Sequence, residues 1–201
     1  MDLNIPQSFF QVESIPLYCD FAKQGTVVVV DTETTGLTDA DDVVQLAVEV
    51  LKNGNVDFRK AVYLKNQVPI DGTEAQKING ITDAMLAEKG FAPIDVLEDF
   101  LALLETTIAA EGKVLLVAHN LSFDWRMIAN MLSRYGCSPI PKEVIPCCTK
   151  NFVKSLQLPK DVLPSNRLCD CIKSFNLQAQ NSHNALDDAD ACMFLFRFLT
   201  S

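Results

Sequence analysis

The fold is decided by one short stretch of the chain, Val27-Val28-Val29-Val30-Asp31-Thr32-Glu33-Thr34-Thr35-Gly36-Leu37. Four consecutive β-branched apolar residues are typical of a strand that is buried on both faces. Asp31 and Glu33 follow at positions i and i+2, so strand alternation places both carboxylates on the same face. Two carboxylates at the end of a buried strand repel each other unless a cation lies between them. The stretch therefore predicts a site for a divalent metal ion.

The composition is that of a globular protein. The chain has 201 residues, of which 48% are hydrophobic and 21% are charged. This length suits one well-packed domain and is short for two. We expect the domain to span residues 25–201 and to follow an N-terminal extension over residues 1–24, which lacks a clear hydrophobic period.

The net charge of −9 argues against extended binding along a nucleic acid duplex, since proteins that contact many phosphates are usually basic. It leaves room for an enzyme that holds a short strand end through bound cations. The seven cysteines and the lack of a signal-peptide pattern predict reduced thiols and a cytoplasmic protein. No apolar run reaches the roughly 20 residues that span a bilayer, so we expect no membrane partner. The oligomeric state has no signature in the sequence.

The order of the expected elements indicates an α/β fold with a mixed sheet. Strands at 26–31, 43–51 and 55–64 have short links, one of them the Asn53-Gly54 turn, and should form an antiparallel meander. Strands at 114–118 and 144–148 alternate with helices and should pair in parallel. Helices are expected near 17–23, 73–78, 83–89, 95–110, 122–135, 149–156, 167–175 and 185–199.

Two further acidic sites follow later in the chain. In the run 118–124, a buried strand ends and Asp124 enters the first turn of a helix that we expect Ser122 to cap. First-turn aspartates are common without any catalytic role, so this position alone is weak evidence. In the run 183–191, His183 lies just before or at the start of the last helix, and we expect Asp188 in its second turn.

Four carboxylates and a histidine fit hydrolysis of a phosphodiester bond with two metal ions. Such ions hold the attacking and the leaving oxygen of an in-line displacement. Carboxylate ligands favour Mg²⁺ or Mn²⁺ over zinc, and a neutral histidine can take the proton of the attacking water. We therefore expect two Mg²⁺ (or Mn²⁺) ions. The hypothesis requires three distant segments to converge.

The three sites together resemble the motifs of the DEDDh family. This is the DnaQ-like group of 3′–5′ exonucleases, which includes the proofreading subunit of bacterial replicative DNA polymerase. The resemblance rests on the runs 31–37, 119–124 and 183–188 and covers about residues 27–199. It implies an RNase H-like fold, in which helices flank a central mixed five-stranded sheet, and it makes residues 25–201 the exonuclease domain.

The resemblance also implies the roles of the acidic residues and of the histidine. All five catalytic positions of the family are matched, so loss of activity is not indicated. His183 is the implied general base that activates water. The implied metal ligands are Asp31, Glu33, Asp124 and Asp188.

Substrate contacts are implied at three further positions. Leu37 and Phe123 resemble the family's contacts to the terminal bases, although plain hydrophobic packing is the alternative for both. The main chain near Thr34 resembles a contact to the terminal 3′-hydroxyl. The loop at 78–82 resembles a family loop that lies near the substrate, with Asn79 in place of the usual histidine.

The function implied is that of a metal-dependent 3′–5′ exonuclease that releases nucleoside 5′-monophosphates from single-stranded or frayed 3′ ends. DNA is favoured over RNA, because the first motif looks more like that of the DNA-proofreading members. The alternatives are an exoribonuclease of the same family, an RNase H-type endonuclease, and a non-catalytic interaction module with the same fold. A polymerase or another protein is the expected protein partner, and the N-terminal extension is one place where it could bind.

Overall fold

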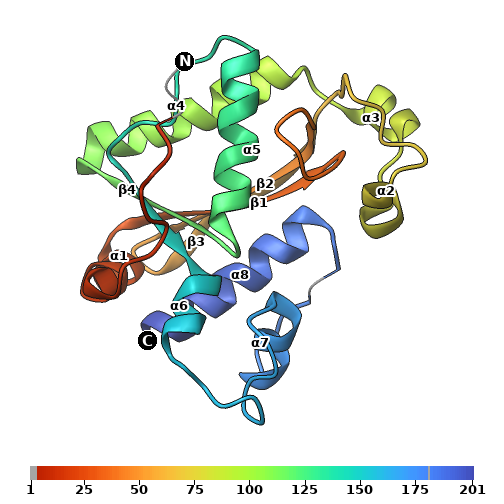
Figure 1. Ribbon diagram of the computed structural model, residues 1–201. Coiled ribbons are helices and arrows are strands. Elements are labelled where there is room, and N and C mark those ends of the chain that lie inside the picture. The colour runs from red at the N-terminus through yellow and green to blue at the C-terminus, as the bar shows by residue number, and fades with distance from the viewer. Residues whose placement is uncertain (1–3, 181) are drawn as a thin grey trace.

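The computed structural model describes residues 4–180 and 182–201 and contains one mixed sheet of five strands (Figure 1). Their order across the sheet is β3-β2-β1-β4-β5. The pairs β1–β2 and β2–β3 are antiparallel, whereas β1–β4 and β4–β5 are parallel. The predicted meander and mixed sheet are therefore confirmed. The strands are β1 (Thr26–Thr34), β2 (Val43–Lys52), β3 (Asn55–Tyr63), β4 (Val114–Ala118) and β5 (Val144–Cys148).

Helices cover both faces of the sheet (Figure 1). The helices α4 and α5 pack on one face, and α1 and α8 pack on the other. A short 3-10 turn, η1 (Val12–Ser14), precedes them. The helices are α1 (Ile15–Gln24), α2 (Glu74–Asn79), α3 (Asp83–Lys89), α4 (Pro93–Glu111), α5 (Leu121–Arg134), α6 (Thr149–Ser155), α7 (Leu168–Ser174) and α8 (Ala185–Thr200).

The valine run of β1 is buried on both faces, as its composition predicts. Val28 and Val30 face the core under α4 and α5, and Val27 and Val29 face the core under α1 and α8. The strand also continues past the predicted end at Asp31, because its ladder with β2 extends as far as Thr34. Both carboxylates of the first motif consequently lie on regular strand, where their direction is fixed by the pleat.

Helix α5 begins earlier than the sequence predicts. Ser122 is not its N-cap: the cap is Asn120, which adopts the left-handed conformation with φ of 86°. Asparagine tolerates this region better than most residues, and the sharp turn lets the helix start directly after β4. The expectation that Asp124 lies in the first turn is confirmed.

Helix α8 begins at Ala185, with Asn184 as its N-cap. The Asn184 Oδ1 accepts a hydrogen bond of 3.1 Å from the main-chain N–H of Leu186, which closes the first turn. The helix begins at the predicted residue, but Asp188 lies in its first turn and not in the second, so the predicted turn is wrong. The carboxylate benefits from the helix dipole at this position.

The N-terminal segment packs closely on the sheet domain. The helix predicted near 17–23 is present as α1, which buries Tyr18 and Phe21 against the core under α8. Further upstream, the ring of Phe10 lies 5.0 Å from that of Phe152, and the carbonyl of Phe9 accepts a 2.7 Å hydrogen bond from Cys148. The division of the chain at residue 25 stays a prediction. No described helix is both long and apolar enough to cross a membrane.

Replacing Tyr18 by alanine should destabilise the protein. Its side chain is 2% exposed, and removing a buried aromatic side chain typically costs about 3–5 kcal/mol of unfolding free energy. Urea denaturation measures this cost. Val12→Ala is the matched control on the exposed side of the same segment and should change stability by less than about 0.5 kcal/mol. Equal, small effects of both substitutions would show that the segment does not contribute to the folded core.

Candidate active site

Three of the four predicted carboxylates converge at the end of β1. One oxygen each from Asp31, Glu33 and Asp188 lies within 4.8 Å of the others. Asp31 and Glu33 are on the α8 face of the sheet, opposite Ala47 and Gln45 of β2. The predicted same-face arrangement of the two strand carboxylates is therefore confirmed.

Asp188 reaches this cluster because β2 holds the start of α8. The side-chain oxygen of Gln45 accepts a buried hydrogen bond of 3.1 Å from the main-chain N–H of Ala185. Ala185 and Ala189 pack against Ala47, and these small side chains let the helix approach the sheet closely. The first turn of α8 is thus fixed beside the carboxylates of β1.

Asp124 lies on α5, which packs on the opposite face of the sheet from α8, and its side chain is held by β1 itself. Its Oδ1 accepts hydrogen bonds from the main-chain N–H of Thr32 at 3.1 Å and from the Thr32 hydroxyl at 2.8 Å. The β1–β4 ladder ends at Val29 and Val117, so the next part of that strand edge is open to the carboxylate. Asp124 is 4% exposed, and its charge acts on both Asp31 and Glu33.

Burial and mutual repulsion disfavour the ionised forms of these acids. Burial raises the pKa of Asp31 well above its usual range, and the charges of Asp124, Asp188 and Glu33 raise it further. Burial also raises the pKa of Glu33 to about 7, against the opposing hydrogen bond from Asn79. The pKa of Asp124 is raised to about 7, again mainly by burial, while the hydrogen bonds from Thr32 lower it.

The donor set fits a hard divalent cation. All of the clustered donor atoms are carboxylate oxygens, which Mg²⁺ and Mn²⁺ prefer, and a cation among them would offset both the burial and the repulsion. Asp31, Glu33 and Asp188 are the residues that could hold the first ion. Asp124 lies beside them, and both hydrogen bonds from Thr32 fall on its Oδ1.

His183 lies outside the cluster of three carboxylates, on the loop that enters α8. Its side chain is exposed, its φ is 55°, and it makes no hydrogen bond with any residue that the structure describes. The main chain of this loop is tied to the site, because the N–H of Ser182 donates to Asp188 Oδ1 at 3.0 Å. The assignment of His183 as general base stays a prediction.

The second histidine, His119, is held inside the fold by hydrogen bonds. His119 is largely buried; its Nε2 lies 2.9 Å from the carbonyl oxygen of Asn166, and its Nδ1 lies 3.0 Å from the hydroxyl of Thr149. A carbonyl can only accept, so Nε2 carries the proton and Nδ1 accepts from Thr149. Burial lowers the pKa of His119 to about 4, the hydrogen bond to Asn166 opposes this, and nearby Lys150 lowers it further.

The three predicted substrate contacts have different surroundings. Leu37 is 76% exposed on the loop after β1, whereas Phe123 is half-buried in the first turn of α5. Thr34 is buried, and its hydroxyl donates to the carbonyl of Gly36 at 2.6 Å. Contact with a substrate stays a prediction for all three positions.

Four residues that support the site were not assigned these roles from the sequence: Thr32, Gln45, Asn79 and Arg126. Asn79 donates a hydrogen bond of 3.2 Å to Glu33, while its own oxygen accepts from the N–H of Ile81, so the last residue of α2 orients a site carboxylate. Arg126 contacts both Leu37 and Phe123. Arg126 had a local signal, since it is three residues after Phe123 on a helix and therefore on the same side. Asn79 had a signal in the resemblance of the loop at 78–82 to a family loop near the substrate.

Comparison with known proteins agrees with this site. The RNase_T family model, described as an exonuclease, matches residues 28–196. DNA polymerase III PolC-type of Listeria monocytogenes is 31% identical over 177 residues, which are 86% of this chain but 11% of that protein. The chain thus spans about a tenth of the length of the PolC-type relatives. DNA polymerase III subunit epsilon of Treponema pallidum is 30% identical over 174 residues, covering 83% of this chain and 72% of that protein.

Solved structures share the fold. E. coli exonuclease I in complex with a dT13 oligonucleotide superposes with a TM-score of 0.73 at 22% identity, over 89% of this chain and 41% of that one. Exonuclease X in complex with 5′ overhanging duplex DNA superposes with a TM-score of 0.61 at 24% identity, over 86% of this chain and 90% of that one. A mixed sheet with buried carboxylates at the end of its central strand is the architecture of a DnaQ-like nuclease. The chain belongs to the exonuclease family, as its three motifs predict.

The metal-free protein should lose stability as the pH rises from about 4 to about 7. In this range the folded state keeps protons on Glu33 and Asp124, whose pKa values are raised to about 7, while the unfolded chain has released them. Urea denaturation in EDTA between pH 5 and pH 8 measures this slope. Asp31→Asn should flatten it and raise stability at pH 8, because one charge of the cluster is removed. Wild-type stability that is independent of pH would contradict the buried acidic cluster.

His119 should remain neutral well below the usual histidine range, because burial lowers its pKa to about 4. The chain has two histidines, so proton NMR of the imidazole resonances can follow each one, with His183→Gln to assign them. One resonance should show no titration between pH 7 and pH 5.5. If His119 titrates with a midpoint near 6.5, its imidazole is solvated and the bonds to Thr149 and Asn166 are absent in solution.

Proposed function

We propose that this protein is a metal-dependent 3′–5′ exonuclease that releases nucleoside 5′-monophosphates from single-stranded or frayed 3′ ends. DNA is its preferred substrate. The observation that carries the proposal is the convergence of Asp31, Glu33 and Asp188 within 4.8 Å, with Asp124 held beside them. Relatives named as DNA polymerase III proteins, and fold neighbours solved with DNA, support the choice of DNA.

The four carboxylates would hold two Mg²⁺ or Mn²⁺ ions. Such ions, when bound, stabilise the charge that develops on the phosphate oxygens. The contribution of the protein is to keep the carboxylates in place: Thr32 fixes Asp124, and the anchored first turn of α8 fixes Asp188. This rigidity matters because sub-ångström displacements of a ligand weaken a preorganised site.

His183 takes the proton from the attacking water. Its ring is exposed, and its loop is held beside the cluster because the Ser182 N–H donates to Asp188. The main chain at Thr34 orients the terminal 3′-hydroxyl. Leu37 and Phe123 contact the terminal bases, which explains a preference for unpaired ends, since paired bases are stacked and do not present their faces.

The protein partner that we propose is a DNA polymerase, in the cytoplasm. The support is the similarity to polymerase III proteins of the PolC and epsilon types. The acidic net charge of −9 is in keeping with an enzyme that contacts few phosphates at one strand end.

A time course on oligonucleotides labelled at the 5′ end tests the proposal. Single-stranded DNA and RNA of one sequence are incubated with Mg²⁺, with Mn²⁺ or with EDTA. We expect a descending ladder with single-nucleotide steps, dependent on metal and faster on DNA. Faster digestion of RNA would favour the exoribonuclease alternative. Internal cuts would favour an endonuclease, and the lack of any cleavage would support a non-catalytic module.

Substitutions at the site should distinguish the role of a metal ligand, Asp31, from that of the general base, His183. Asp31→Ala should abolish hydrolysis and leave the protein folded, because it removes a proposed metal ligand and one of several mutually repelling charges. His183→Ala should lower the rate about 10²–10⁴-fold, the usual contribution of a general base. Steady-state rates on single-stranded DNA check both effects. A loss of less than about threefold in His183→Ala would rule out its role as the base.

A further inference from the structure

One guanidinium joins the two residues that we propose to contact the terminal bases. Arg126 Nη2 donates a hydrogen bond of 3.0 Å to the main-chain carbonyl of Leu37. The same side chain lies over the ring of Phe123, with 5.6 Å between the guanidinium carbon and the ring centroid. Its Nη1 forms an ion pair of 2.5 Å with Asp39. A single planar group therefore contacts the loop after β1 and the first turn of α5 at once.

The loop that carries Leu37 is well ordered by its own hydrogen bonds. The carboxylate of Asp41 accepts from the main-chain N–H of Thr38 at 2.8 Å, from its hydroxyl at 2.6 Å, and from the hydroxyl of Thr35 at 3.2 Å. The same carboxylate lies so close to Gly36 that a Cβ there would come within 2.6 Å of it. The loop thus presents the exposed Leu37 from a defined backbone, next to α5.

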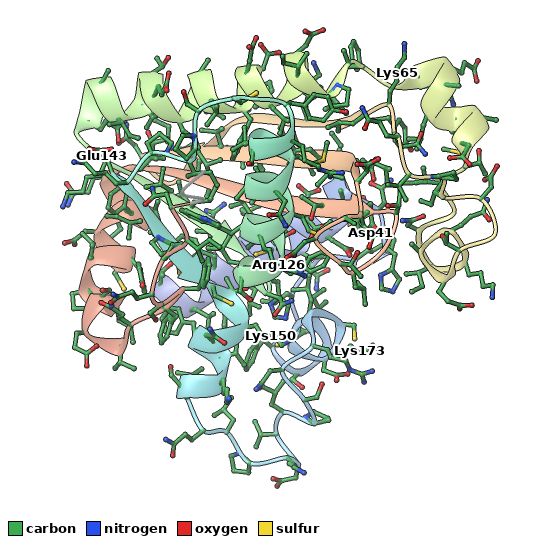
Figure 2. All side chains as sticks on the ribbon, turned by 45° about the horizontal axis from the view of Figure 1, so that its top comes forward. Asp41, Lys65, Arg126, Glu143, Lys150 and Lys173 are labelled. Atoms are coloured by element: carbon green, nitrogen blue, oxygen red, sulfur yellow. The ribbon has the colours of Figure 1, made fainter. Side chains whose placement is uncertain are left out.

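A second arginine of α5 holds the far end of the same loop. Arg134 donates to the carbonyl oxygens of Ala40 and Asp41 at 3.3 Å and 2.7 Å, and pairs with buried Asp42 at 2.9 Å. Arg126 and Asp41 are labelled in Figure 2, where α5 and the loop lie side by side. Since Arg134 secures the end near β2, Arg126 controls the end that carries Leu37.

We propose that Arg126 is a positioning residue that sets the spacing between Leu37 and Phe123, and with it the slot for the terminal bases. The proposal rests on the proposed function, in which these two side chains contact the strand end. Arginine suits the role because its rigid fork can donate to a carbonyl while its face lies on an aromatic ring. A lysine ammonium has no planar face to lay on the ring while it donates to the carbonyl. The ion pair with Asp39 is exposed and adds little by itself.

The kinetic signature follows from these contacts. Within the described part of the chain, Arg126 makes no hydrogen bond or ion pair with the four site carboxylates. Loss of Arg126 should therefore weaken binding of the strand end without changing the chemical step. The effect should require a terminal base, because a strand that ends in an abasic nucleotide has nothing to place in the slot.

The test compares kcat and KM of wild type and Arg126→Ala on single-stranded DNA with a normal 3′-terminal nucleotide and with an abasic one. On the normal strand, KM should rise about tenfold, which corresponds to about 1.4 kcal/mol of binding, and kcat should stay within about twofold. On the abasic strand, both enzymes should have the same KM. Arg126→Lys, which keeps the charge and the stem, should behave like Arg126→Ala. Asp39→Ala is the matched control and should leave KM unchanged, because Leu37 and Phe123 keep their contacts.

Several results would overturn the proposal while the exonuclease activity stands. These are an unchanged KM in Arg126→Ala, an equal rise on the normal and abasic strands, recovery by lysine, or a loss confined to kcat. Thermal unfolding of each variant is measured alongside, and if the alanine variant does not fold, the lysine variant supplies the same comparison. An inactive wild-type enzyme would refute the proposed function itself, a result distinct from each of these.

Discussion

The burial of several like charges around the end of β1 is the constraint on which the rest of the site depends. Asp31 lies among three other carboxylates, and burial and repulsion together raise its pKa well above the usual range. Such a cluster costs folding free energy, so the surrounding elements must hold it in place. Thr32 binds Asp124, Gln45 anchors the helix of Asp188, and Asn79 donates to Glu33. Each of the three carboxylates around Asp31 is thus held by a residue from a different element of the fold.

The architecture separates stability from chemistry. The valine run of β1 places apolar side chains in the cores on both sides of the sheet, and those cores carry most of the packing. The β1–β4 ladder stops at Val29, and the first polar residue of the site, Asp31, follows two positions later. The open strand edge beyond that point is what lets Asp124 reach the main chain of Thr32. A longer β4 would fill this edge with ladder hydrogen bonds and exclude the carboxylate.

Most of the fold was predictable because its signals are local. The valine run, the Asn53-Gly54 turn and the apolar strand Val114–Ala118 define strands and their links from neighbouring residues alone. Local signals failed at the start of α5, where Asn120 caps the helix in place of Ser122, because the tight exit from β4 requires a left-handed residue. The start of α8 at Ala185 was predicted, although Asp188 falls in its first turn and not in its second. For the site, the sequence predicted that Asp31 and Glu33 lie on the same face of their strand, because strand alternation is a local property. The bonds from Thr32 to Asp124 and from Gln45 to α8 join residues distant in sequence, and no local pattern pairs them.

The central claim is that the acidic residues at the end of β1 form one site for divalent cations, and calorimetric titration of Mn²⁺ into metal-free protein tests it most directly. Wild type should bind about two ions when thymidine 5′-monophosphate is present. The Asp31→Asn variant should lose this binding while it keeps its fold, since Asp31 lies at the centre of the cluster. Equal Mn²⁺ binding by both proteins, or no binding by wild type, would contradict the account.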